Sequence, residues 1–284
     1  KPSWPNIDTV KAIPWIEQKL GVTLAPSQRE AVAKAVSSKV MVITGGPGVG
    51  KTTLVNAILR ILVAKGVKVA LAAPTGRAAK RLSESTGMEA KTIHRLLEVD
   101  PKHGGFKRGI EEPLDCDLLV IDETSMVDVS LMASLVKALS DRTSLILVGD
   151  VDQLPSVGPG QVLADVIGSG AVPVVTLTEI FRQAAESRII TNAHKVNAGR
   201  MPDLDTRKDG ETDFYFVEAR DPEDAVAKII EIVKNRLPNR FSFDPIQDVQ
   251  VLCPMNRGGI GARSLNVDLQ KALNPPTDEI FVER

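Results

Sequence analysis

The chain has 284 residues, with 35 Lys and Arg against 36 Asp and Glu, a formal net charge of −1 and 43% hydrophobic residues. This length fits about two domains, and the composition excludes a disordered tail and a collagen-like repeat. The near-neutral charge excludes a protein coated with basic surface, so any nucleic-acid contact has to come from a local groove. No apolar run approaches the roughly 20 residues that span a bilayer, which predicts a cytoplasmic chain without a membrane partner.

Helical and strand-like patterns alternate along the first part of the chain. Apolar residues at helical spacing predict helices over residues 27–38, 51–65, 75–85 and 128–140. Short continuous apolar runs predict buried strands over residues 39–45, 67–74, 117–122, 144–150 and 172–177. Pro173 places the last strand near a sheet edge. Because strand–helix–strand units of this length form parallel sheets, we predict one α/β domain over residues 1–185.

The alternation restarts in the remaining residues, 186–284. Strands are predicted over residues 214–217 and 250–253, and helices over residues 222–236 and 264–273. Two strands cannot complete a sheet of this kind, so we expect the beginning of a second α/β domain. The chain starts at Lys1 without an initiator methionine, which suggests a piece of a longer protein.

The two cysteines, Cys116 and Cys253, lie far apart in the chain and lack the spacing of metal ligands. Apolar, strand-like residues flank both of them. They are therefore expected to be core thiols in a reducing compartment.

A phosphate loop follows the first predicted strand. Residues 45–52 read Gly-Gly-Pro-Gly-Val-Gly-Lys-Thr and match the G-x-x-x-x-G-K-[ST] pattern, with a helix predicted after them. Glycines let backbone N–H groups turn toward phosphate oxygens, and the helix N-terminus adds its positive dipole end. We expect Lys51 to reach the β- and γ-phosphates of ATP, and Thr52 to bind Mg²⁺. The expected nucleotide-binding residues are Gly46, Pro47, Gly48, Val49, Gly50, Lys51, Thr52 and Thr53.

An acidic pair, Asp122 and Glu123, ends the strand predicted over residues 117–122. The apolar residues before the pair embed this strand in the sheet. This places Asp122 beside the phosphate loop, where it can hold Mg²⁺ through water. Glu123 can then orient and deprotonate a water, which favours hydrolysis of ATP over transfer to an acceptor.

Further motifs narrow the class of phosphate-loop protein. Residues 149–155 read Gly-Asp-Val-Asp-Gln-Leu-Pro and resemble motif III of superfamily 1 helicases. Residues 73–79 resemble motif Ia, residues 92–97 motif Ib, and residues 181–183 motif IV of the same superfamily. Together with Gln28, which matches the adenine-reading Q motif, the set is similar in order and spacing to RecD-like helicases of superfamily 1B.

This resemblance implies a RecA-like fold and a role for each matched residue. Gln28 would read adenine, and Gln153 would sense the γ-phosphate and couple it to DNA. Arg182 would act as a charge-stabilising finger, a role worth about 10³ to 10⁵ in rate. The resemblance also implies 5′→3′ movement on single-stranded DNA. The implied strand track consists of Pro74, Thr75, Gly76, Arg77, His94 and Arg95.

A hairpin is predicted near residues 98–114. Gly104 and Gly105 form a turn signal between basic flanks. In the family, this position carries a small β-hairpin, the pin, that splits the duplex. Phe106 is the candidate to press on the first base pair at or near the pin tip, where an aromatic face replaces base stacking. The alternative is a disordered basic surface loop.

Each matched residue also has an ordinary structural alternative. Gln28 fits an exposed helix start, Arg182 a surface ion pair, and His94 a hydrogen-bonded structural histidine. Arg77, Lys80 and Arg81 fit a solvated face of a helix.

Three functions stay open. The first is an ATP-dependent DNA helicase motor, present here as its N-terminal portion. The second is a phosphate-loop ATPase or remodeller that does not act on DNA, and the third is a nucleotide-binding module without turnover. Motifs V and VI of the family are not recognisable after Asn274, so we expect no unwinding by these residues alone.

Overall fold

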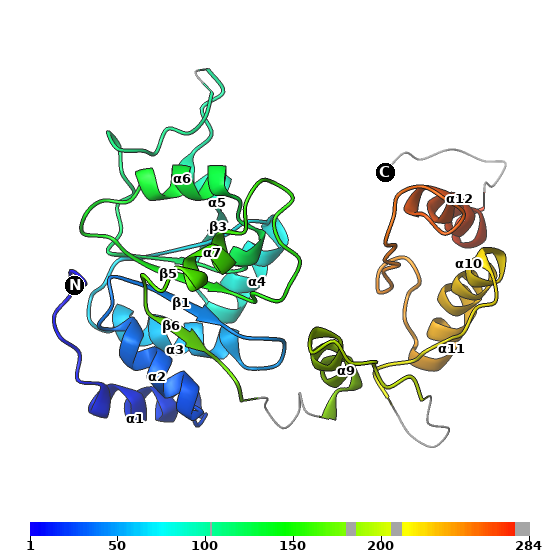
Figure 1. Ribbon diagram of the computed structural model, residues 1–284, viewed down its shortest axis with the longest axis horizontal. Coiled ribbons are helices and arrows are strands. Elements are labelled where there is room, and N and C mark those ends of the chain that lie inside the picture. The colour runs from blue at the N-terminus through cyan, green and yellow to red at the C-terminus, as the bar shows by residue number, and fades with distance from the viewer. Residues whose placement is uncertain (103, 180–185, 206–211, 276–284) are drawn as a thin grey trace. The chain divides into compact units, whose positions relative to one another are not determined.

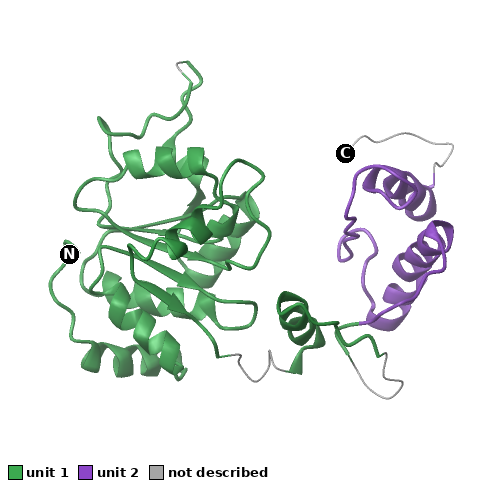
Figure 2. Cartoon of the chain, in the orientation of Figure 1, with its two compact units in different colours: residues 1–214 green, residues 215–284 purple. Residues whose placement is uncertain are grey.

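The computed structural model describes residues 1–102, 104–179, 186–205 and 212–275. The chain divides into two compact units, residues 1–214 and 215–284 (Figure 2). This division falls later than the boundary expected after residue 185, because helix α9 (Arg188–Asn197) makes contacts with loops of the first unit. None of the helices in the described ranges combines the length and the apolar character needed to cross a lipid bilayer.

A six-stranded sheet forms the centre of the first unit, in the order β3-β2-β4-β5-β1-β6 (Figure 1). Each strand pairing in the described residues is parallel, which confirms the α/β prediction. The edge position of β6, which directly follows Pro173, is confirmed as well. The strands are β1 (Val40–Thr44), β2 (Val69–Ala73), β3 (Ala90–Thr92), β4 (Leu118–Ile121), β5 (Ser144–Gly149) and β6 (Val174–Thr176).

Two apolar layers cover the two faces of the sheet, because successive side chains of a strand point to opposite faces. On β4, Leu118 and Val120 pack into the first layer, and Leu119 and Ile121 pack into the second. Helices α1 (Thr9–Leu20), α2 (Pro26–Ala35), α3 (Lys51–Val63) and α4 (Gly76–Thr86) contribute to the first layer. Helices α5 (Ile93–Leu97), α6 (Val129–Lys137) and α7 (Val162–Gly168) contribute to the second.

A short hairpin lies between α5 and β4. Val99 pairs with Phe106 in an antiparallel bridge, and the backbone N–H of Asp100 donates to the carbonyl oxygen of Gly105 at 3.0 Å. Phe106 is half-buried against the second layer. Phe106 thus lies in the bridge beside the turn, with its ring packed on the core, and its contact with a base pair stays a prediction.

The described residues of the second unit are helical or irregular. They contain α10 (Pro222–Glu231), a π-helical turn (Ile232–Arg236), α11 (Leu237–Phe241) and α12 (Ala262–Leu273). The helices predicted over residues 222–236 and 264–273 are confirmed.

The strands predicted over residues 214–217 and 250–253 are wrong. Within the described ranges neither segment pairs with a strand, and Phe216 and Leu252 are 45% and 82% exposed. A strand needs a neighbour for its backbone N–H and C=O groups, so an apolar run without a neighbour does not become one.

Candidate nucleotide and DNA site

The candidate site groups gather at one edge of the parallel sheet. The phosphate loop follows β1, Asp122 follows β4, and the segment that contains Gln153 follows β5. Strand β5 lies between β1 and β4. Because parallel strands end at the same edge, these three loops come together there, as in other open α/β sheets that bind ligands.

The phosphate loop has the backbone shape that an anion cradle requires. Gly48 and Gly50 have φ angles of 77° and 74°, which a side chain would strain. Helix α3 starts at Lys51, and no side chain caps it, so its first N–H groups are available to an anion. Lys51 Nζ donates to the carbonyl oxygens of Gly45 at 2.5 Å and Gly46 at 2.9 Å. This loop and its lysine fit a nucleotide phosphate.

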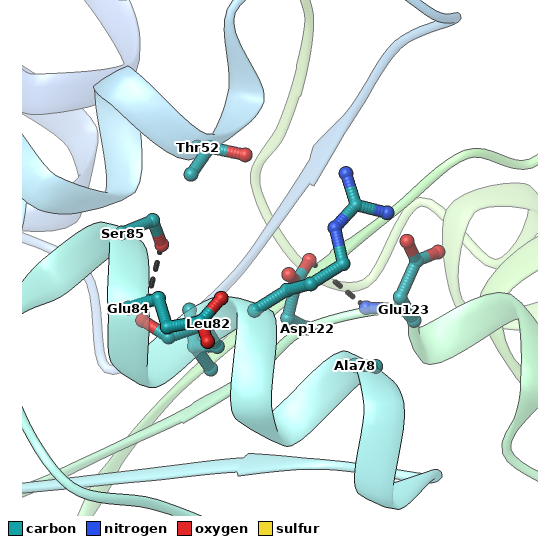
Figure 3. Close-up of a pocket in the computed structure, with 8 residues that line it drawn as sticks. Thr52, Ala78, Leu82, Glu84, Ser85, Asp122 and Glu123 are labelled. Atoms are coloured by element: carbon teal, nitrogen blue, oxygen red, sulfur yellow. Dashed lines mark hydrogen bonds between the residues drawn. The ribbon is translucent and has the colours of Figure 1, made fainter. Parts of the chain in front are cut away.

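Asp122 and Glu123 meet Thr52 in one cavity of about 360 Å³ (Figure 3). The backbone N–H of Glu123 donates to Asp122 Oδ1 at 2.9 Å. Burial raises the pKa of both carboxyls, and the positive charges of Lys51 and Arg81 oppose this effect on each pKa. A hydroxyl and a carboxylate are hard oxygen donors of the kind that Mg²⁺ prefers. Thr52 and Asp122 therefore fit a Mg²⁺ ion.

The loop after β5 is tied to β1 and carries Gln153 at the surface. The backbone N–H of Val151 donates to the buried hydroxyl of Thr44 at 3.3 Å. Gln153 is exposed, and its amide nitrogen donates to buried Asp150 at 3.4 Å. Gln153 thus remains accessible at the same sheet edge as the acidic pair.

Gln28 is buried rather than exposed, which excludes the exposed-helix-start alternative. Its Nε2 donates to the carbonyl oxygen of Val49 at 3.2 Å, and its Oε1 accepts from the backbone N–H of Ala25 at 3.0 Å. The side chain therefore braces the phosphate loop from α2. The same nitrogen also lies 3.5 Å from the carbonyl oxygen of Gly50, so the loop occupies both of its N–H groups.

The residues expected to contact DNA lie after two neighbouring strands. Thr75 caps α4 after β2, and Thr92 caps α5 after β3. Both threonine hydroxyls accept a backbone N–H at 3.2 Å, from Ala78 and Arg95 respectively. The exposed side chains around these caps include Arg77, His94 and Arg95. The His94 ring lies 5.7 Å from the ring of Phe106, which joins the hairpin base to α5.

Helix α9 contributes contacts that the sequence patterns did not indicate. His194 Nε2 lies 3.4 Å from the carbonyl oxygen of Pro47 in the phosphate loop, and Asn197 Nδ2 donates to Asp152 Oδ2 at 2.8 Å. A Cβ placed on Gly46 would come within 2.8 Å of His194 Cε1. Arg182, the expected finger, lies outside the described residues.

Comparisons with a family profile and with known proteins indicate the family of this chain. An AAA domain family profile matches residues 28–159. The chain is 35% identical over 260 residues to the ATP-dependent RecD2 DNA helicase of Deinococcus radiodurans. It is 32% identical over 300 residues to the RecBCD enzyme subunit RecD of Mycolicibacterium smegmatis. These alignments cover 92% and 94% of this chain.

The chain belongs to the RecD-like family. The RecD-like chain spans 34% of the first of these relatives and 54% of the second. The Pif1 helicase from Candida albicans has a similar fold, with a TM-score of 0.51 and 21% identity over 78% of this chain and 56% of that chain.

Proposed function

We propose that this RecD-like chain is part of an ATP-dependent DNA helicase motor. It binds ATP at the phosphate loop, hydrolyses it, and uses the cycle to move on single-stranded DNA and separate the duplex. The observation that carries the proposal is the single sheet edge at which Lys51, the Asp122–Glu123 pair and Gln153 meet. The names of the relatives, which describe DNA helicases and RecBCD subunits, agree with it.

Each residue of the edge has one task in hydrolysis. The backbone N–H groups of Gly46 and of residues 48–53 hold the phosphates, and Lys51 leaves the loop carbonyls to neutralise phosphate charge. Mg²⁺, when bound by Thr52 and Asp122, supplies further charge stabilisation. Glu123 orients a water and takes its proton. Gln153 senses the γ-phosphate, and Arg182 stabilises the transition state.

The DNA track lies on the neighbouring strand ends. Pro74, Thr75, Gly76 and Arg77 contact the strand from the start of α4, and His94 and Arg95 contact it from α5. Movement is 5′→3′, and the setting is cytoplasmic DNA processing. The hairpin near residues 98–114 faces the duplex junction.

A nucleotide and DNA assay tests the proposal. Fluorescent Mg·ATP titration, steady-state ATPase with and without oligo(dT), and strand displacement on a 5′-tailed duplex are measured on these 284 residues. We expect nucleotide binding and weak, salt-sensitive DNA binding. We expect no unwinding, because the described residues contain a single sheet. Binding of ATP without any binding of DNA would instead favour a remodeller.

A further inference from the structure

Side chains from three helices hold the carbonyl oxygens of the phosphate loop. Lys51 of α3 donates to the first two carbonyl oxygens of the loop, and Gln28 of α2 donates to that of Val49. His194 of α9 reaches the carbonyl oxygen of Pro47, which lies between them in the chain. Donors on these carbonyls fix the peptide planes of the loop, so its N–H groups stay available to phosphate.

The contact of His194 becomes more important when a nucleotide binds. Phosphate draws Lys51 away from the loop carbonyls, and His194 then remains as a donor to the first half of the loop. Its Nε2 lies 3.4 Å from the carbonyl oxygen of Pro47. Because a carbonyl oxygen only accepts, Nε2 has to carry the ring proton in this bond. The ring also lies directly against Gly46, where a Cβ would come within 2.8 Å of Cε1.

Asn197 makes a matching contact with the loop after β5. It lies three residues after His194, so the two side chains share one face of α9. Its Nδ2 donates to Asp152 Oδ2 at 2.8 Å. Asp152 directly precedes Gln153, and its backbone N–H donates to Asp150 Oδ1 at 3.1 Å. One face of α9 therefore holds both the phosphate loop and the loop that carries Gln153.

Other faces of α9 tie the helix to the segment that follows it. Asn192 is 4% exposed, donates to the carbonyl oxygen of Asp203 at 3.1 Å and accepts from its backbone N–H at 2.8 Å. Arg188 Nη2 donates to the same carbonyl oxygen at 3.1 Å, and Lys195 Nζ lies 3.9 Å from Asp203 Oδ2. The two loop contacts thus come from a helix with its own support.

We propose that His194 and Asn197 are positioning residues for recognition of the terminal phosphate of ATP. They hold the phosphate loop and the loop of Gln153 at a fixed separation, so the terminal phosphate meets the loop N–H groups and Gln153 together. ADP lacks this phosphate and depends on the phosphate loop alone. The inference rests on the proposed function, in which Gln153 senses the γ-phosphate.

The test compares two nucleotides in binding alone, so it does not depend on turnover. Displacement of a fluorescent ADP analogue from the 284-residue chain gives the dissociation constants of Mg·ADP and Mg·AMP-PNP. Their ratio is the preference for the terminal phosphate. Because each variant removes one hydrogen bond, His194→Ala and Asn197→Ala should each lower this preference about three- to ten-fold. The affinity for Mg·ADP should stay nearly unchanged, since Gln28 still braces the loop.

Further variants separate positioning from folding. His194→Gln keeps an N–H donor and should retain part of the preference. Asn197→Asp sets a second carboxylate against Asp152 and should lower the preference at least as far as Asn197→Ala. The double alanine variant should lose less than the product of the two single losses, because both residues act through α9. Lys195→Ala is the matched control, since its partner is Asp203, and it should keep the wild-type preference.

The remaining outcomes are decisive. An unchanged preference in both alanine variants would overturn the inference, and so would an equal loss of ADP and AMP-PNP affinity, which a purely structural role would produce. Nucleotide binding by the wild type without a preference for AMP-PNP would overturn the inference and leave nucleotide binding intact. Absence of nucleotide binding by the wild type would overturn the proposed function itself.

Discussion

The side-chain amide nitrogen of Gln28 lies 3.2 Å from the carbonyl oxygen of Val49, inside the phosphate loop. Gln28 is 1% exposed and also accepts from the backbone N–H of Ala25. A residue expected to touch adenine thus supports the loop that holds the phosphates. Support of the loop does not depend on which base the nucleotide carries, whereas adenine reading requires adenine.

Gln28→Ala is expected to weaken ATP and GTP binding to a similar extent. It leaves a buried carbonyl and a backbone N–H unpaired, which costs about 1–3 kcal/mol of stability. Thermal melting and titration with both nucleotides check this. Gln28→Glu is the control, since it keeps the acceptor for Ala25 and loses the donor to Val49. A loss confined to ATP would establish adenine reading instead.

Glu123→Gln should leave nucleotide affinity nearly intact and abolish hydrolysis, because it removes the base and spares Lys51 and Thr52. Lys51→Ala should weaken binding itself. Nucleotide titration and phosphate release separate these effects. Burial raises the pKa of Glu123, and only its ionised carboxylate can take a proton from water. As the pH is lowered, the hydrolysis rate should therefore begin to fall at a pH above the range in which carboxyl groups ordinarily titrate. Normal turnover by Glu123→Gln would exclude the catalytic role.

Phe106→Ala should weaken the binding of single-stranded DNA, because it removes the ring that lies against His94. The aromatic pair holds His94 in place and contributes about 0.5–1.5 kcal/mol to that arrangement beyond its buried area, so we expect a freed His94 to lower oligo(dT) affinity. Lys102→Ala, at the hairpin turn, should instead affect binding to a forked duplex. If Phe106→Ala lowered fork binding alone, a role of Phe106 against the first base pair would be supported instead.

Gly46→Ala should reduce nucleotide affinity through His194. The added methyl group would lie 2.8 Å from His194 Cε1, and overpacking typically costs about 1–3 kcal/mol. His194→Ala removes the obstacle, so the double variant should regain affinity relative to Gly46→Ala in the same titration. No recovery would mean that the methyl group obstructs the phosphate itself.

Cys116 should resist thiol reagents in the folded chain. It is buried, and burial raises its pKa to about 11, so little reactive thiolate forms at neutral pH. Cys253 is half-buried and should react first. Labelling followed by peptide mapping checks the order, and equal labelling after addition of urea is the control. Early labelling of Cys116 would show that the second apolar layer opens locally.

The sequence alone determined the parallel sheet and the positions of the phosphate loop and the acidic pair. These features depend on local patterns. Continuous apolar runs form buried strands, and the glycines of residues 45–52 allow the turn that leads into the following helix. The two wrong strand predictions, at residues 214–217 and 250–253, show where local patterns fail. A strand forms only beside a neighbouring strand, and a local pattern does not reveal whether one is present.

The tertiary structure decided which partners each side chain meets. Phe106 packs its ring against the core beside the hairpin turn, Gln28 supports the loop from inside, and Arg81 shares a cavity with Glu123. The order of the strands in the sheet brings together residues that are far apart in the chain. Burial then restricts each side chain to the partners that lie next to it. A single sequence specifies the chemical groups of this site, whereas their contacts follow from the packing of α2, α4 and the hairpin onto the sheet.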